Sequence, residues 1–101
     1  MTQGNGGRRA VVFMEPKPGK AKELLDLTRE ILVQVRKANP GLLKVEVNTL
    51  EEDSDQIVLY YTWRSKQDQM AYEASPMFSE ILDRIMPLMS NRRLIRADNI
   101  E

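Results

Sequence analysis

Aromatic side chains that could bind a flat ligand are concentrated in one short stretch, from Tyr61 to Phe78. The indole of Trp63 could form a pocket wall that stacks on an aromatic ring. The hydroxyl of Tyr72 could donate to a substrate oxygen or form part of a proton path. Both side chains could equally fill a hydrophobic core, because large aromatic residues bury much apolar surface.

Histidine and cysteine are both absent from the 101 residues. Thiol nucleophiles, thiolate metal sites and disulfides are therefore excluded, together with the commonest general base and the commonest transition-metal ligand. Any chemistry must use carboxylates, tyrosine, tryptophan, hydroxyl groups, amides, lysine, arginine or the substrate itself. We expect no metal site and no bound cofactor.

Charged side chains offer a second set of candidates. A base that deprotonates a phenol could be one of four carboxylates, although most such residues lie on solvated helix faces: Glu15, Glu73, Glu80 and Asp83. A basic cluster near the C-terminus could bind an anionic substrate or protect an edge strand: Arg92, Arg93 and Arg96. The methionines could form a permissive binding surface or fill gaps in the core.

Length and composition indicate one ordinary globular domain. The chain is 42% hydrophobic, and its 15 basic residues balance its 15 acidic ones. Nucleic acid and membrane are not expected partners, because there is no net charge and no apolar run of about 20 residues. We expect a flexible N-terminal tail over 1–8, a single domain over 9–101 and a cytoplasmic location. We also expect a homodimer, because a domain of this size buries only about two-thirds of its unfolded surface when alone.

The hydrophobic patterns predict four strands and two helical regions. Strands are predicted over 9–15, 42–50, 56–63 and 91–100. One helix is predicted over 20–38, and a second over 65–74 that restarts at Ser75-Pro76 and runs to Pro87. The order β-α-β-β-α-β is that of a ferredoxin-like α+β fold, with helices on one face of an antiparallel sheet.

Strand alternation assigns side chains to the two faces of this sheet. If Trp63 faces the helices, then Ile57, Leu59 and Tyr61 do so too, while Val58 and Tyr60 face the other way. Leu43, Val45 and Val47 should share one face of their strand. An uncovered sheet face carrying Val11, Phe13 and Val58 would be apolar, so we expect a second subunit to cover it and form a dimeric α+β barrel.

From Arg9 to Ile100 the chain resembles the antibiotic biosynthesis monooxygenase (ABM) domain. The resemblance rests on the order of elements and on four motifs: Pro18-Gly19-Lys20 after the first strand, Pro40-Gly41-Leu42 before the second, Tyr61-x-Trp63-x-Ser65, and Ser75-Pro76-x-Phe78. In the oxygenases of this family, the resemblance implies that an electron-rich substrate anion reduces dioxygen directly, without metal or flavin. Other members degrade haem or isomerise small molecules.

Two departures from the family pattern limit what the resemblance implies. Many members carry histidine at the positions of Tyr72 and Met77. The site residues of the haem-degrading branch would fall at Val12, Tyr72 and Leu82, where the Asn, Trp and His of that branch are not retained. Haem degradation is therefore not expected.

The sequence thus predicts a cofactor-independent monooxygenase acting on a small aromatic substrate such as a quinol, an anthrone or a polyketide-like compound. A non-catalytic ligand-binding or structural dimer remains the main alternative, and a small-molecule isomerase is a third. Tyr72 is the predicted catalytic residue. The predicted substrate-binding residues are Val12, Met14, Tyr61, Trp63, Tyr72, Phe78, Leu82 and Arg96.

Overall fold

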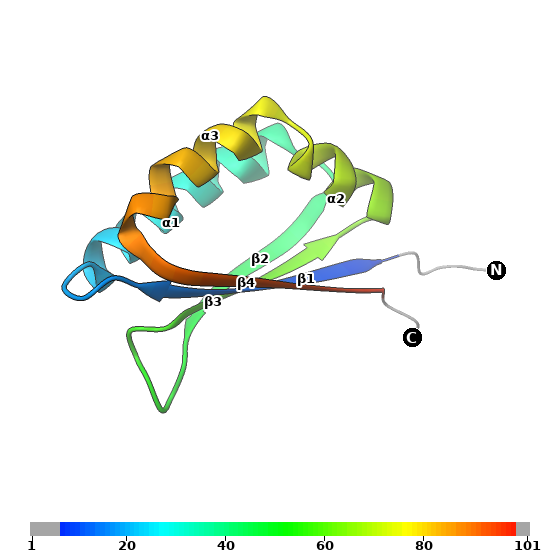
Figure 1. Ribbon diagram of the computed structural model, residues 1–101. Helices are drawn as coiled ribbons and strands as arrows, with labels where there is room; N and C mark the ends of the chain where they lie inside the picture. Colours follow the sequence, from blue (N-terminus) through cyan, green and yellow to red (C-terminus); the bar gives the residue numbers. More distant parts are fainter. Residues whose placement is uncertain (1–6, 99–101) are drawn as a thin grey trace.

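One antiparallel sheet with helices on a single face makes up the computed structural model, which describes residues 7–98. The elements are β1 (Arg8–Pro16), α1 (Ala21–Ala38), β2 (Leu42–Thr49), β3 (Ile57–Trp63), α2 (Lys66–Glu73), α3 (Pro76–Ile85), the 3₁₀ turn η1 (Met86–Leu88) and β4 (Met89–Asp98). The strand order is β2-β3-β1-β4. Figure 1 shows α1, α2 and α3 on the same side of this sheet. The predicted ferredoxin-like α+β fold is confirmed.

Two serine caps divide the second helical region into α2 and α3. The hydroxyl of Ser65 accepts a hydrogen bond from the Asp68 backbone N–H, and that of Ser75 accepts one from Phe78. Pro76 then occupies the first turn of α3, where its missing N–H leaves no helical hydrogen bond unmade. Because the chain turns at Ser75, the end of α2 and the start of α3 both present side chains to the sheet.

The first and last strands begin earlier than the sequence predicts. Arg8, assigned to the tail, is the first residue of β1 and pairs with Trp63 and Asp98. Pro87 lies within η1, and β4 starts directly after this turn at Met89. The rest of the predicted tail, and the end of the predicted last strand at 99–100, fall outside the described residues.

Leu43 differs from the prediction because β2 contains a bulge. Leu42 pairs with Trp63 and Lys44 with Thr62, so Leu43 is an extra residue without a partner on β3. A bulge of this kind shifts the alternation by one position. Leu42 is therefore the buried residue on the face of Val45 and Val47, while Leu43 is 59% exposed.

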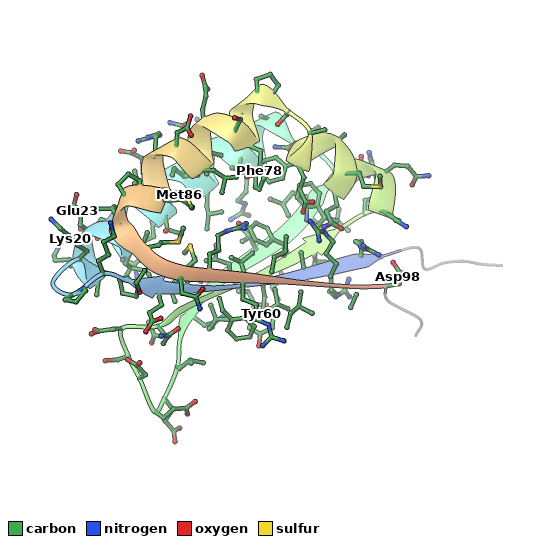
Figure 2. The ribbon with its side chains drawn as sticks, viewed as in Figure 1. Lys20, Glu23, Tyr60, Phe78, Met86 and Asp98 are labelled. Carbon is green, nitrogen blue, oxygen red and sulfur yellow. The ribbon has the colours of Figure 1, made fainter. Side chains whose placement is uncertain are left out.

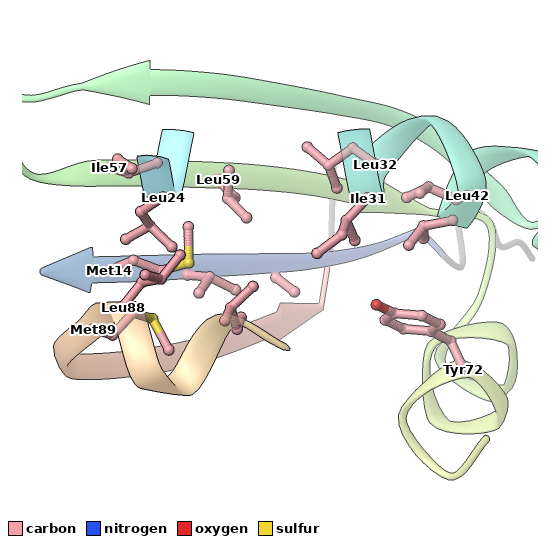
Figure 3. Close-up of a cluster of buried hydrophobic side chains, with 14 of the residues drawn as sticks. Met14, Leu24, Ile31, Leu32, Leu42, Ile57, Leu59, Tyr72, Leu88 and Met89 are labelled. Atoms are coloured by element: carbon pink, nitrogen blue, oxygen red, sulfur yellow. The ribbon is translucent and has the colours of Figure 1, made fainter. Parts of the chain in front are cut away.

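The hydrophobic core lies between the helices and the sheet. It takes alternate residues from each central strand, among them Val12 and Met14 of β1 and Leu59 of β3. Helix α1 contributes one apolar stripe, which Figure 3 shows packed over these strands. The core therefore shares its location with the aromatic side chains that the sequence singles out.

The opposite face of the sheet carries no helix (Figure 1). Tyr60 lies on this face, as Figure 2 shows, and is 46% exposed. Ile95 is exposed there, and Val11 and Phe13 are half-buried. None of the helices within residues 7–98 is long and apolar enough to cross a membrane.

Candidate functional site

A row of four aromatic rings connects β3 with α2 and α3. Tyr61 and Trp63 come from the helix-facing side of β3, with ring centroids 6.4 Å apart. Trp63 lies 5.4 Å from Tyr72 of α2, and Tyr72 lies 5.1 Å from Phe78 of α3 in an edge-to-face arrangement. Such contacts stabilise aromatic pairs beyond simple burial. The rings therefore form a continuous wall across three elements.

This wall surrounds a small hollow between the helices and the sheet. The lining residues are Ala10, Val12, Tyr61, Trp63, Tyr72, Glu73, Phe78, Arg92 and Leu94. Its volume is about 20 Å³, which is enough for one water-sized molecule. Trp63 and Tyr72 are buried, whereas Phe78 and Arg92 are only partly buried. The side of the hollow formed by Phe78 and Arg92 is therefore the one nearest to solvent.

Arg92 contributes a positive charge at this opening. Its guanidinium carbon lies 5.9 Å from the centroid of the Phe78 ring, within the range of a cation–π contact. The Nε atom of Arg92 is buried and has no hydrogen-bond partner among the described residues. A buried donor without a partner carries a desolvation cost. An anionic oxygen bound in the hollow would pair with this donor.

Glu73 brings a carboxylate to the same hollow, held by neighbouring side chains. Its Oε1 accepts from Arg96 Nη2 at 2.7 Å, and its Oε2 accepts from Gln69 Nε2 at 2.8 Å. Gln69 is 1% exposed and accepts in turn from Arg8 Nε at 2.7 Å. A carboxylate has about four acceptor positions, so Glu73 keeps capacity for about two more hydrogen bonds.

Both tyrosines of the wall are protonated at neutral pH. Burial raises the pKa of Tyr72 to about 12, an effect that nearby Arg92 reduces and Glu73 increases. Burial also raises the pKa of Tyr61, with further contributions from Tyr72 and Glu73. Desolvation disfavours the charged phenolate. The two hydroxyls can therefore donate hydrogen bonds, but neither can serve as a general base near pH 7.

A second hollow lies on the other side of the Tyr61–Tyr72 pair. It is lined by Met14, Thr28, Ile31, Leu32, Leu59, Tyr61, Tyr72, Ile81 and Ile85, and its volume is about 30 Å³. Thr28 is 4% exposed, and its hydroxyl has no hydrogen-bond partner among the described residues. Figure 3 shows the Tyr72 hydroxyl directed from α2 toward the side-chain cluster that includes Ile31.

The structure brings five of the eight predicted binding residues together around the first hollow: Val12, Tyr61, Trp63, Tyr72 and Phe78. Met14 lines the second hollow, and Leu82 lies on a groove beside β4. Arg96 is held by Glu73 and does not line either hollow. Whether these residues bind substrate stays a prediction.

The prediction of the site omitted Arg92, Glu73, Gln69 and Thr28. The first two were recognised only as members of charged groups. On β4 the pairing with β1 turns Arg92 and Arg96 toward the helices and Arg93 toward the open face, so the basic cluster is divided. The alternation of side chains along the last strand would have predicted that Arg93 faces away from Arg92 and Arg96. Within residues 7–98, no three acidic side chains gather closely enough to hold a metal ion.

The fold and the aromatic hollow together define a small α+β domain with a candidate site between its helices and its sheet. The chain belongs to the antibiotic biosynthesis monooxygenase family, whose sequence profile matches residues 8–84. No curated protein matches the chain in sequence.

Solved structures with the same fold come from several microorganisms. One from Caulobacter crescentus, provisionally named an antibiotic biosynthesis monooxygenase, is 16% identical with a TM-score of 0.86, over 95% of this chain and 92% of its own. One from Nitrosomonas europaea, with the same provisional name, is 17% identical with a TM-score of 0.83, over 99% and 96%. A Mycobacterium tuberculosis protein is 14% identical with a TM-score of 0.82, over 94% and 96%. At these identities the likeness establishes the fold alone.

Proposed function

We propose that the protein oxidises an electron-rich aromatic hydroxy compound with dioxygen, and that the substrate itself supplies the electrons. The observation that carries this proposal is the aromatic hollow with one buried, unpartnered arginine donor and one carboxylate in its lining. Membership of the family supports it further. Quinols, anthrones and related polyketide-like phenols are the substrate class.

The aromatic wall would bind the flat face of the substrate. Trp63 and Tyr72 are fixed by burial and provide the stacking surface. The hollow in the free protein is smaller than one aromatic ring, so the substrate must displace the side chains of Phe78 and Arg92. Partly buried side chains can change rotamer at modest cost, and the substrate would replace the contact between Phe78 and Arg92 with its own.

The charged residues would then generate the reactive anion. Glu73 accepts the proton of the substrate hydroxyl, and Arg92 pairs with the resulting phenolate or enolate oxygen. The anion transfers one electron to dioxygen, giving superoxide and a substrate radical, which combine into a peroxide. The peroxide takes back the proton held by Glu73. The ring carbon then loses its own proton as the O–O bond breaks, and this proton combines with the departing hydroxide. One oxygen atom ends as a carbonyl and the other as water, and the substrate supplies all four electrons.

Tyr72 would act as a neutral hydrogen-bond donor in this reaction. Its raised pKa keeps the hydroxyl protonated, so it can stabilise negative charge that develops on oxygen but cannot remove a proton. The Tyr72→Phe variant preserves the ring of the wall and removes only this donor. We therefore expect kcat to fall about tenfold, with little change in the KM of the aromatic substrate.

Oxygen uptake with a panel of dihydroxy-aromatic and anthrone-like compounds tests the proposal, with each rate corrected for autoxidation. Tyr60→Phe is the matched control for Tyr72→Phe, because Tyr60 lies on the opposite face of the sheet. Arg92→Gln should lower kcat/KM roughly tenfold or more, whereas Arg93→Gln, one residue away on the open face, should not.

The main alternative is a binding domain without turnover. Its signature would be no oxygen uptake above autoxidation for any compound, together with a rise in melting temperature on adding a flat aromatic ligand. That rise should be reduced in Trp63→Phe if the ligand occupies the aromatic hollow.

We also propose that the active form is a homodimer. The sheet face away from the helices presents Val11, Phe13, Tyr60 and Ile95 to solvent in the single chain. A second copy of the same face would bury this apolar surface, which a monomeric protein seldom leaves uncovered.

A further inference from the structure

The second hollow is suited to a small apolar molecule. Its volume of about 30 Å³ exceeds the roughly 10–15 Å³ that one water-sized molecule needs. Most of its wall is aliphatic or thioether side chain: Met14, Ile31, Leu32, Leu59, Ile81 and Ile85. Cavities with such walls can stay dry and bind apolar guests such as xenon. Dioxygen has similar size and polarity.

One polar side chain of this wall lacks a partner. The Thr28 hydroxyl is buried within α1 and makes no hydrogen bond among residues 7–98. Tyr72 lines the same hollow, and its hydroxyl is a neutral donor directed to this side of the wall (Figure 3). The hollow therefore holds one hydroxyl donor without a partner, that of Thr28, and has a second hydroxyl donor, that of Tyr72, in its wall.

We propose that this second hollow is the dioxygen site, and that Thr28 and Tyr72 donate hydrogen bonds to superoxide as it forms. The proposal rests on the proposed function and supplies a place for its second substrate. Dioxygen has low polarity and accepts hydrogen bonds only weakly. A pocket with apolar walls therefore favours its entry. Superoxide carries a full negative charge, so hydroxyls already in place stabilise the product of electron transfer more than the reactant.

The position of the hollow fits the electron transfer. Tyr61 and Tyr72 line both hollows, so a ring bound in the first and dioxygen in the second would both contact this pair. One electron passes from the substrate anion to dioxygen and leaves a substrate radical. The superoxide then moves to the radical and forms the C–O bond of the peroxide. Thr28 and Tyr72 neither gain nor lose protons in this step.

Two measurements test the dioxygen site. The first is a crystal structure of the wild-type protein under xenon pressure, where we expect one xenon atom beside Thr28. The second is the dependence of oxygen uptake on dioxygen concentration, at a fixed saturating level of the aromatic substrate. Thr28→Val, which keeps the shape and removes the hydroxyl, should lower kcat/KM for dioxygen about tenfold or more and leave the KM of the aromatic substrate unchanged.

Conservative variants separate this role from a structural one. Thr28→Ser keeps the hydroxyl and should retain most of the wild-type kcat/KM for dioxygen. Thr49→Val is the matched control, because Thr49 is exposed on β2 away from both hollows. Ile81→Phe should fill the hollow, exclude xenon and raise the KM for dioxygen.

The outcomes distinguish this inference from the proposed function. An ordered water bound to Thr28 with no xenon in the hollow overturns the dioxygen site. An unchanged kcat/KM for dioxygen in Thr28→Val overturns it too. In either case, oxygen uptake by the wild type would still support the proposed function. If the wild type oxidises no compound of the panel, the proposed function fails, and xenon binding decides alone whether the hollow admits an apolar gas.

Discussion

Gly41 should be the backbone position on which the candidate site depends most directly. It lies between α1 and β2, and its carbonyl accepts a hydrogen bond of 2.7 Å from the Arg64 backbone N–H. A Cβ atom at this position would lie 2.7 Å from both Cβ and Oδ2 of Asp68, and closer still to Cγ. Real contacts of this kind do not occur. Gly41→Ala must therefore displace Asp68 or the backbone.

Asp68 has little freedom to move. It accepts hydrogen bonds from Arg64 Nε and Nη2, both at 2.9 Å, and from the Ser65 hydroxyl at 2.7 Å. Its own N–H donates to Ser65 Oγ and forms the N-cap of α2. Displacing Asp68 disturbs the cap and the ion pair together. Because α2 carries Tyr72, the change should also alter the aromatic wall.

The expected cost follows from these contacts. Loss of an N-cap costs about 1 kcal/mol, and an exposed ion pair contributes about 0.2–1 kcal/mol. In the opposite direction, replacing glycine by alanine stabilises by about 0.4–1 kcal/mol through the unfolded chain. With residual strain at the contact, we expect Gly41→Ala to lower the free energy of unfolding by about 1–2 kcal/mol. For a domain of this size that corresponds to a melting temperature lower by roughly 5–15 °C.

Denaturant and thermal unfolding followed by circular dichroism would measure this cost. In an Asp68→Gly background the clashing side chain is gone, so Gly41→Ala should cost much less than in the wild type. Gly19→Ala is the control. Gly19 has a φ of +77° and open space around its Cβ position, so its cost should be the same in both backgrounds. The reasoning is refuted if Gly41→Ala is as stable as the wild type, or if its cost is unchanged by Asp68→Gly.

Two further predictions concern assembly and pH. Ile95→Glu places a charge on the open sheet face and should convert the proposed dimer into a monomer at micromolar concentration. Analytical ultracentrifugation measures this change. A wild type that is itself monomeric would contradict the proposed dimer. Hydrogen bonds from Arg64 and Ser65 lower the pKa of Asp68 below its usual value, so Asp68 stabilises the fold above about pH 4 and loses this contribution as the pH falls. Asp68→Asn should therefore be less stable than the wild type at pH 7, with a difference that shrinks below pH 4 in denaturant unfolding, and a constant difference would contradict the assignment.

The type and order of the elements follow from local sequence. Ser65 and Ser75-Pro76 start helices through contacts within four residues, so their effect can be read without knowing the fold. The alternation that predicts Leu59, Tyr61 and Trp63 on the helix side is equally local, because successive side chains of a strand point to opposite faces.

Strand register and bulges are decided by pairing between segments distant in sequence. Leu43 reads as one more member of an alternating strand, and only its pairing with β3 reveals that it is an extra residue. Likewise, alternation turns both Arg92 and Arg96 toward the helices and cannot choose between them. The choice depends on α2, which places Glu73 beside Arg96 and leaves Arg92 next to Phe78.

The sequence by itself determined the fold class, the aromatic composition of the site and the absence of histidine and cysteine chemistry, because each depends on residue type or local pattern. Only the tertiary structure decided which polar groups lack partners. Thr28 reads as part of the apolar stripe of α1, and Arg92 as one of three arginines. Their unpaired atoms become evident only when α1, α3 and the sheet enclose them, because hydrogen-bond satisfaction is a property of the packed chain.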